Sequence, residues 1–316
     1  MGKPKKIFAV DNLLKYGILY LLILLIIISS FLSKNFFTLD NFLNVIRQMS
    51  STVILAAGMA LVIITAGIDL SVGSVVALSS MAVAGAMDSW NFNIGFAIIF
   101  AIIIGVVIGT INGLLIGYFK ISPMIVTLAT MNGSRGIAML YNDGAQIIGL
   151  PSGFKTIGRG SILGLPVPIL IAIVIVLIIF SLSRYTVIGK YFYAIGSNEK
   201  VAMLAGINIV KTKVIAYLLC SICASIVGVI FASRLNMGDP TVGSGLEMDA
   251  IASVILGGIN LYGGSGNILG AVIGATFMAV LGNSLNLIGI STFWQMIVKA
   301  VVLIIAALVY SKREVD

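Results

Sequence analysis

Asp69 and Ser71 lie in the glycine-flanked stretch GIDLSVG and are the most chemically suggestive residues of a very apolar sequence. A carboxylate inside such a chain is costly, and is a candidate for contact with a solute or an ion. The same spacing suits an N-cap, which needs only local geometry and is the favoured interpretation. Further polar residues at Asn112, Asn132 and Asn283 could line a path for a polar, uncharged solute, or join helices by ordinary hydrogen bonds.

Other chemistries find little support in the residues. The chain has no histidine, which removes histidine-based zinc sites and Ser-His-Asp triads. Its two cysteines, Cys220 and Cys223, lie within an apolar segment and are interpreted as packing residues rather than a metal or redox pair. No G-x-x-x-x-G-K-[ST] motif is present, so any ATP must bind to another chain. We therefore expect no enzyme activity, no metal and no cofactor.

The composition is that of an integral membrane protein. Of the 316 residues, 59% are hydrophobic and 9% charged, whereas soluble domains carry about 25% charged residues. Continuous apolar runs of helix-spanning length predict an all-α protein with about ten membrane helices in a single domain, residues 1–316. The expected spans are 16–33, 45–66, 72–88, 94–118, 123–140, 167–183, 213–232, 248–261, 266–288 and 293–311. The second, third, eighth and ninth could be short or half-crossing.

The basic residues predict which side each loop occupies. Most of the 19 lysines and arginines fall in segments that ten spans would place inside. The positive-inside rule therefore predicts that the N-terminal segment 1–15, the C-terminus and the loop 184–212 lie in the cytoplasm. The loops 141–166 and 233–249 are expected outside. The net charge of +8 thus reflects membrane topology and requires no nucleic acid.

Two patterns suggest internal organisation. ALVIITAGIDLSVG, residues 60–73, resembles IASVILGGINLYGG, residues 251–264, and internal duplication is common among transporters. Glycines also recur every four residues, which places them on one helix face, where a neighbouring helix can approach closely. These rows are Gly105, Gly109, Gly113 and Gly117, and then Gly266, Gly270 and Gly274 with Gly282 two turns later. Whether the repeat is parallel or inverted stays open.

A polar, helix-forming stretch, GSNEKVAMLAGI, interrupts the apolar chain from Gly196 onward. Asn198 or Ser197 can cap a short helix at its start, and Gly206 can end it at the C′ position. Small residues there would expose a low-profile surface that fits a groove on another protein. A solvated helix that merely connects two spans is the alternative interpretation.

Three separated blocks now carry a resemblance that covers about residues 40 to 311. GIDLSVGSVVAL, RYTVIGKYFYAIGSNEKVAMLAGINI and AIASVILGGINLYGGSGNILGAVIGA resemble the membrane permease subunits of bacterial ABC importers for simple sugars. The resemblance implies a coupling helix that docks on an ATPase subunit. It also implies an extracytoplasmic sugar-binding protein, a second permease subunit, here expected to be identical, and transport by alternating access. The coupling residues carried over are Gly196, Asn198, Glu199, Ala202, Ala205 and Gly206.

The expected cargo is a pentose such as ribose, with xylose, arabinose, galactose, autoinducer-2 or nucleosides as alternatives. An ATP-independent secondary carrier, with Asp69 as its ion site, is the competing hypothesis from another class. Charges on the expected outer loops are candidates for docking the binding protein, since opposite charges steer association. These are the basic Lys155, Arg159 and Arg234 and the acidic Asp143, Asp239 and Glu247.

Overall fold

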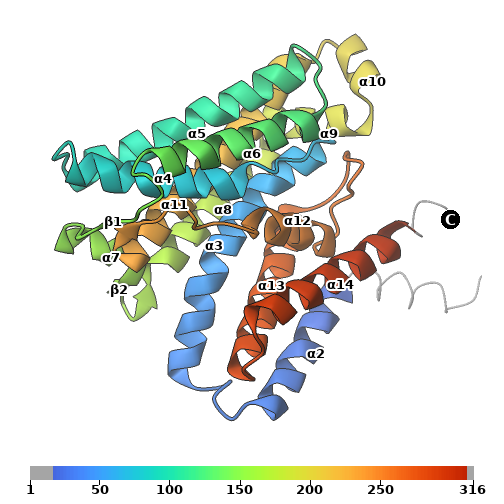
Figure 1. Ribbon diagram of the computed structural model, residues 1–316. Coiled ribbons are helices and arrows are strands. Elements are labelled where there is room, and N and C mark those ends of the chain that lie inside the picture. Colours follow the sequence, from blue (N-terminus) through green and yellow to red (C-terminus); the bar gives the residue numbers. More distant parts are fainter. Residues whose placement is uncertain (1–16, 312–316) are drawn as a thin grey trace, which may run out of the picture.

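The computed structural model describes residues 17–311, with side chains as far as residue 306, and is built almost entirely of helices (Figure 1). The long helices are α2 (Gly17–Leu32), α3 (Leu39–Ile64), α4 (Val72–Asp88), α5 (Ile94–Gly117), α6 (Pro123–Leu140), α8 (Val167–Tyr185), α11 (Ile209–Leu235), α13 (Ile268–Leu287) and α14 (Thr292–Ser311). The shorter ones are η1 (Ser152–Phe154), α7 (Lys155–Arg159), α9 (Val187–Ser197), α10 (Glu199–Leu204) and α12 (Leu246–Leu256).

The all-α membrane architecture predicted from hydropathy is confirmed. By length and composition α3, α5, α8, α11 and α13 can each cross a bilayer, and α2, α4 and the part of α14 up to residue 306 are shorter apolar helices. Nine of the ten expected spans coincide with a helix. Eight of these match to within a few residues, and the ninth, α3, begins six residues earlier than expected, at Leu39. The segment 1–15, expected in the cytoplasm, lies outside the described residues.

The predicted eighth span, residues 248–261, is one of those expected to be short or half-crossing, and the structure has a short helix there. The helix there, α12, has 11 residues and measures about 16 Å, roughly half of a ~30 Å hydrocarbon core. It ends where the glycine-rich stretch begins, because Gly258, Gly263 and Gly264 adopt positive φ angles that do not continue a helix. The chain thus passes from α12 to α13 through an irregular segment.

Three predicted loops are shorter or more ordered than expected. The segment 184–212 is mostly helical, since it contains α9 and α10. The loop 233–249 shrinks to residues 236–245, because α11 continues to Leu235 before Asn236 turns with φ 62°. The loop 141–166 carries α7 and three two-residue strands, β1 (Ile147–Ile148), β2 (Ser161–Ile162) and β3 (Leu165–Pro166). Antiparallel β2 and β3 form a hairpin, and β1 pairs with β4 (Met237–Gly238), Ile147 opposite Gly238.

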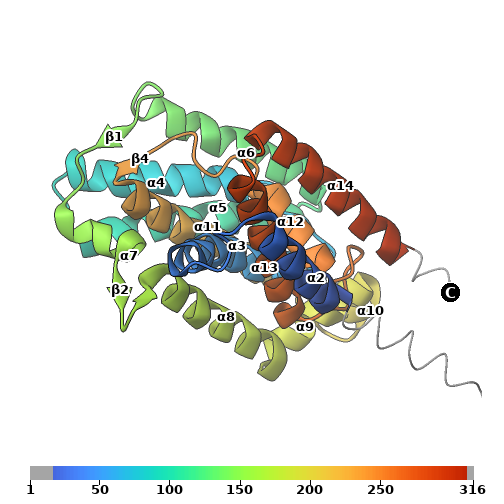
Figure 2. The same ribbon diagram turned by 90° about the horizontal axis from the view of Figure 1, so that it is seen from below.

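Helix α3 runs through the centre of the molecule. Figure 2 shows it almost end-on, with α11, α8 and α13 around it, and these helices and α12 all pack against it. From Val53 to Ile64 every residue is buried, and this half of α3 is the middle of the hydrophobic core. The preceding half, from Leu39 to Thr52, carries polar and charged side chains and leaves the core.

The first glycine row lies against α11. A Cβ atom at Gly109 would be 2.6 Å from the Cα of Leu218, so only glycine permits this approach, and one at Gly117 would be tightly packed at 3.2 Å from the Cα of Val210. In the second row, Gly270 and Gly274 face α12. The prediction that Gly266 shares their helix is wrong: it precedes α13 and has a φ of 136°.

The two repeated stretches form similar turns that lie side by side. Asp69 accepts a hydrogen bond from the amide of Ser71 at 2.9 Å, and its counterpart Asn260 accepts one from the amide of Tyr262, also at 2.9 Å. Such local bonds from Asp and Asn side chains are typical of turns. The repeat seen in the sequence is therefore also a repeat of local structure.

Candidate transport cavity and coupling surface

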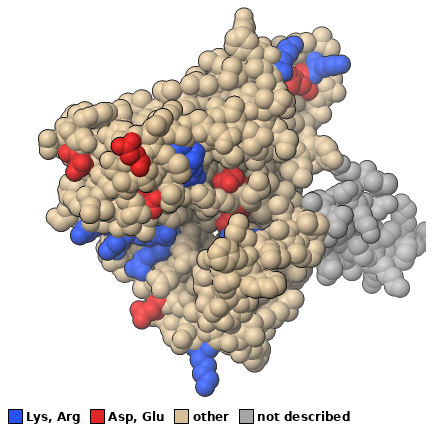
Figure 3. Space-filling view, viewed as in Figure 1, with Lys and Arg blue, Asp and Glu red and all other residues tan. Residues whose placement is uncertain are grey.

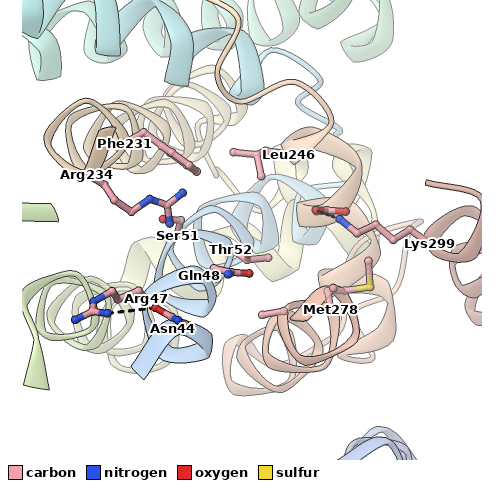
Figure 4. Close-up of a pocket in the computed structure, with 13 residues that line it drawn as sticks. Asn44, Arg47, Gln48, Ser51, Thr52, Phe231, Arg234, Leu246, Met278 and Lys299 are labelled. Carbon is pink, nitrogen blue, oxygen red and sulfur yellow. Dashed lines mark hydrogen bonds and ion pairs between the residues drawn. The ribbon is translucent and has the colours of Figure 1, made fainter. Parts of the chain in front are cut away.

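A cavity of about 400 Å³ opens where α3 leaves the hydrophobic core (Figure 4). Its walls come from α3, α11, α12, α13 and α14. It is large enough to hold a small solute. Its lining residues are Asn44, Arg47, Gln48, Ser51, Thr52, Phe231, Arg234, Leu246, Asp249, Met278, Ala279, Gly282 and Lys299.

The α3 wall carries a polar stripe made of Asn44, Gln48 and Thr52. These residues recur every four positions and therefore share one helix face. Among the residues that the structure describes, neither the Gln48 amide nor the Thr52 hydroxyl has a hydrogen-bonding partner. An amide both donates and accepts hydrogen bonds, so the stripe can bind the hydroxyl groups of an uncharged polyol.

An ion pair stands on the opposite wall. Lys299 of α14 lies 2.7 Å from Asp249 of α12, and their side chains are 30% and 17% exposed. Both residues, with Met278, also line a second cavity of about 480 Å³ between α12, α13 and α14. The pair therefore forms part of the boundary between two neighbouring cavities.

None of the five path candidates predicted from the sequence lines either cavity. The structure does bring three of them together: Ser71 donates to Asp69, and Asn112 donates to the Ser71 hydroxyl at 3.1 Å, all without exposure to solvent. Asn132 is exposed and bonds to the Leu128 carbonyl of its own helix.

Asn283 serves as a link between helices. It donates to Asn41 at 2.8 Å and accepts from it at 3.2 Å, which joins α13 to α3 through a reciprocal amide pair. Ser284, one residue further, bonds to Ser29 of α2 at 2.6 Å. These polar residues thus hold together three helices at the end of the molecule opposite α10.

The sequence assigned none of the lining residues to a cavity: Arg234 was expected to dock the binding protein, Gly282 to belong to a glycine row, and the others had no predicted role. One available signal was the presence of Arg47 and Lys299 inside predicted spans, since ionisable residues in a span usually face a cavity or each other. The other was the four-residue spacing of the α3 stripe. Hydropathy could not predict which residues form the opposite wall of the cavity, because Asp249 and Lys299 lie about 200 residues or more beyond the stripe in the sequence.

The coupling stretch forms the expected short helix, α10. The Asn198 side chain accepts from the amide of Val201 at 3.1 Å, and Gly206, with φ 81°, follows the helix. Amides of Gly206 and Ile207 bond back to the carbonyls of Met203 and Ala202, at 3.0 and 3.1 Å. This is a Schellman motif, so the C′ role expected of Gly206 is what the structure has.

The exposed face of α10 differs from the predicted small-residue surface. Ala202 is buried at 3% exposure, and Val201, Met203 and Leu204 protrude at 60, 58 and 84%. Ala205 and Gly206 remain exposed beside them. Because the small residue turns inward, the surface offered to a partner is apolar and bulky.

Glu199 is held by its own chain. Its carboxylate lies 2.6 Å from the ammonium group of Lys213 on α11. The carboxylate is 46% exposed, so the pair fixes the orientation of α10 more than it adds stability.

The start of the coupling stretch packs on the two repeated turns. A Cβ atom at Gly196 would overlap the carbonyl oxygen of Ile64 and the amide nitrogen of Gly264. The hydroxyl of Ser197 also lies 3.5 Å from the Gly264 carbonyl oxygen. The segment α9–α10 is therefore in direct contact with the end of α3 and with the turn between α12 and α13.

The charged docking candidates lie at the end opposite α10, with one notable exception. Arg159, Asp143 and Asp239 are exposed or half-exposed there. Lys155 is half-buried on α7, and Glu247 is half-buried at the start of α12. Arg234 lines the cavity instead, with its guanidinium 4.5 Å from the ring centre of Phe231.

Buried Cys220 and Cys223 pack against α3, where a Cβ atom at Gly58 would lie 3.0 Å from the Cα of Cys220. Within residues 17–306 no group of three or more cysteine, aspartate or glutamate residues could hold a metal ion.

Known proteins resemble this chain over nearly its whole length. The family described as "Branched-chain amino acid transport system / permease component" matches residues 41–307. A ribose import permease of Escherichia coli K12 is 41% identical over 98% of both chains, and one of Bacillus subtilis is 45% identical over 92% of this chain and 91% of its own. The L-arabinose permease of E. coli is 34% identical over 97% of this chain and 94% of its own.

No solved structure matches the chain. Each of the named relatives is a transport permease, and the match extends through the α3 stripe, the coupling stretch and the second repeated turn. The chain therefore belongs to the branched-chain-type family of membrane permease subunits of ABC importers.

Proposed function

We propose that this chain is the permease subunit of an ATP-driven importer for a pentose such as ribose. The observation that carries the proposal is the graded similarity to relatives, which is 41–45% for ribose import permeases and 33–34% for D-allose and L-arabinose permeases. The polar stripe of Asn44, Gln48 and Thr52 supports it, since neutral hydrogen-bonding groups suit an uncharged polyol.

The proposal requires partner chains. The sequence has no phosphate-binding loop, so ATP hydrolysis belongs to a separate ATPase subunit. The protruding apolar residues of α10 are the surface we assign to it, because exposed apolar groups mark sites of protein contact. A sugar-binding protein would deliver the cargo at the opposite end, and a second copy of this chain would complete the permease.

The charge distribution supports a cytoplasmic position for the α10 end, and with it a cytoplasmic position for both termini. Figure 3 shows that charges are sparse on the visible face and that basic side chains flank an acidic one near α10. Basic residues outnumber acidic ones at this end of the described chain, as the positive-inside rule requires. They are Lys120, Arg184, Lys190, Lys200, Lys211 and Lys213.

Movement of α10 can reach the cavity through few contacts. Closure of the ATPase pair would displace α10, and Gly196 and Ser197 would pass the displacement to the end of α3 and to the turn that joins α12 to α13. All three of these helices line the cavity. The cavity would then open alternately towards either side of the membrane, with no covalent chemistry in this chain.

The test is reconstitution of this chain in proteoliposomes with its ATPase and binding protein. We expect ribose uptake that needs ATP and both partners, and that D-allose and L-arabinose compete poorly. Uptake by the chain alone, driven by an ion gradient and lost in Asp69→Asn, would replace the importer with a secondary carrier. ATP-driven uptake of a different sugar would retain the class and overturn the cargo.

A further inference from the structure

One corner of the cavity holds hydrogen-bond donors without acceptors. Arg47 and Ser51 lie one turn apart on α3, and Arg234 comes from the end of α11. The Nε atom of Arg47 and the hydroxyl of Ser51 are both buried and have no hydrogen-bonding partner within the described residues. Ser51 is only 2% exposed, so bulk water does not satisfy it. Such orphaned groups are costly, and each indicates a missing partner.

The same corner carries positive charge that no carboxylate balances. The ion pairs of the described chain are Lys213–Glu199 and Lys299–Asp249, and neither includes Arg47 or Arg234. The one carboxylate among the lining residues, Asp249, is already neutralised by Lys299. Arg47 and Arg234 thus line one cavity inside a membrane protein without a carboxylate partner among the described residues, and charges in that position are normally paired.

The chemistry of the donors specifies the missing partner. Guanidinium groups offer planar pairs of N–H donors that match the oxygens of carboxylates and phosphates, and a serine hydroxyl adds a further donor. Arg47 donates from one Nη atom to Asn44, at 3.3 Å, and its buried Nε atom has no acceptor among the described residues. Figure 4 shows Arg47, Ser51 and Arg234 on the side of the cavity away from Lys299.

We propose that Arg47, Ser51 and Arg234 form a binding site for a phosphate-type oxyanion, supplied either as free phosphate or as the headgroup of an anionic phospholipid. The bound anion joins α3 to α11 at the end of the molecule opposite α10. It lies beside the polar stripe and leaves Asn44, Gln48 and Thr52 to the solute. The site is independent of the cargo and goes beyond the proposed transport function.

The experiment measures thermal unfolding of the purified full-length chain in a neutral detergent. We expect sodium phosphate to raise the melting temperature in a saturable way, and sodium chloride at equal ionic strength to have no such effect. Arg47→Gln and Arg234→Gln should each weaken apparent phosphate affinity at least tenfold, and Ser51→Ala several-fold. Lys155→Gln removes one charge at the same end of the molecule without touching the cavity, and should behave like the unmodified chain.

A second readout separates loss of the site from failure to fold. Without phosphate, Arg47→Gln should melt no lower than the unmodified chain, because the substitution removes an uncompensated charge. Native mass spectrometry after extraction distinguishes the sources: phosphatidylglycerol retained by the unmodified chain and lost in both glutamine variants identifies a lipid headgroup, and its absence identifies free phosphate. Equal effects of phosphate and chloride, or full phosphate stabilisation of both glutamine variants, would overturn the proposal.

Discussion

The amide nitrogen of Gly264 donates a hydrogen bond of 2.9 Å to the carbonyl oxygen of Ile64, and so joins the two repeated turns of the chain. Gly196 packs directly against both of these atoms. One residue of the coupling stretch therefore meets both repeats at their point of contact. Since α3 ends at this point, and the turn containing Gly264 joins α12 to α13, a movement of α10 would be divided here between α3 and the α12–α13 pair, all of which line the cavity.

Substitution at the junction should impair transport. A methyl group at Gly196, introduced by Gly196→Ala, has no room, and overpacking typically lowers the free energy of unfolding by about 1 to 3 kcal/mol. We expect ribose uptake to fall at least tenfold while the ATPase still copurifies. Gly133→Ala in α6 is the matched control: nothing lies within 4 Å of the new methyl group, and alanine should stabilise that helix by about 0.5 to 1 kcal/mol. Uptake unchanged in Gly196→Ala would contradict the role of the junction.

The Glu199–Lys213 pair can be tested by exchanging its charges. Glu199→Arg places two cations together and should abolish transport with less than about 1 kcal/mol of destabilisation, as is typical of exposed pairs. Adding Lys213→Glu restores the pair with reversed polarity. Recovery of uptake in the double variant means that Glu199 orients α10 within this chain. If uptake stays absent, Glu199 instead contacts the ATPase directly.

The apolar surface of α10 should decide ATPase binding. Leu204 is 84% exposed, so Leu204→Asp costs little in stability but places a charge where an apolar partner is expected. We expect at least a tenfold loss of copurified ATPase and an unchanged melting temperature for the permease alone. Leu163→Asp, at a 99% exposed position in the β2–β3 turn, is the control and should retain the ATPase. Equal retention by both variants would move the docking surface elsewhere.

The amide pair between α3 and α13 should behave as a structural contact. Asn283→Leu leaves the Asn41 Oδ1 atom without its donor, while the Asn41 amide still donates to the Phe36 carbonyl, and should lower the free energy of unfolding by about 0.6 to 1.7 kcal/mol. The apparent KM for ribose should not change, because Asn283 lines neither cavity. Adding Asn41→Leu should recover part of the loss, since both polar groups are then removed together. A raised KM without loss of stability would return Asn283 to the solute path.

The ion pair between the cavities should show strong coupling. Asp249→Asn leaves the Lys299 charge half-buried, at a cost of about 1 to 3 kcal/mol, between the values for exposed and buried pairs. Lys299→Gln should cost a similar amount. The double variant should cost less than the sum, as a double-mutant cycle on the melting free energies would reveal. Strict additivity would mean that the pair contributes no mutual stabilisation.

Hydropathy predicted the helices because each apolar run is long and bounded by polar or glycine residues. At α12 it left open a short or half-crossing helix and placed the end too late, because Gly258, with a positive φ, lies just after the helix. The coupling helix was predictable from its caps, Asn198 and Gly206, because capping is local. That Ala202 faces inward was not, since it depends on how α10 lies against the rest of the chain.

The cavity was the least predictable part. Its polar stripe is visible as a spacing of four on α3, but residues with that spacing also join helices, as Asn41 does. Only tertiary structure brings Asp249, Lys299 and Arg234 to the same place. Conversely, Asp69 is conspicuous in the sequence yet serves a turn that Asn260 forms equally well.

The glycine row of α5 has a consequence for motion. From Gly105 to Gly117 the backbones of α5 and α11 are in contact over more than three turns, so neither helix can rotate or slide without collision. The two helices must move as one rigid body and can serve as the fixed frame of the molecule. Helix α14 is attached mainly through α12, the ion pair and a few contacts to α13. In the proposed transport cycle we therefore expect the α5–α11 frame to stay fixed and the α12–α14 side to move against it.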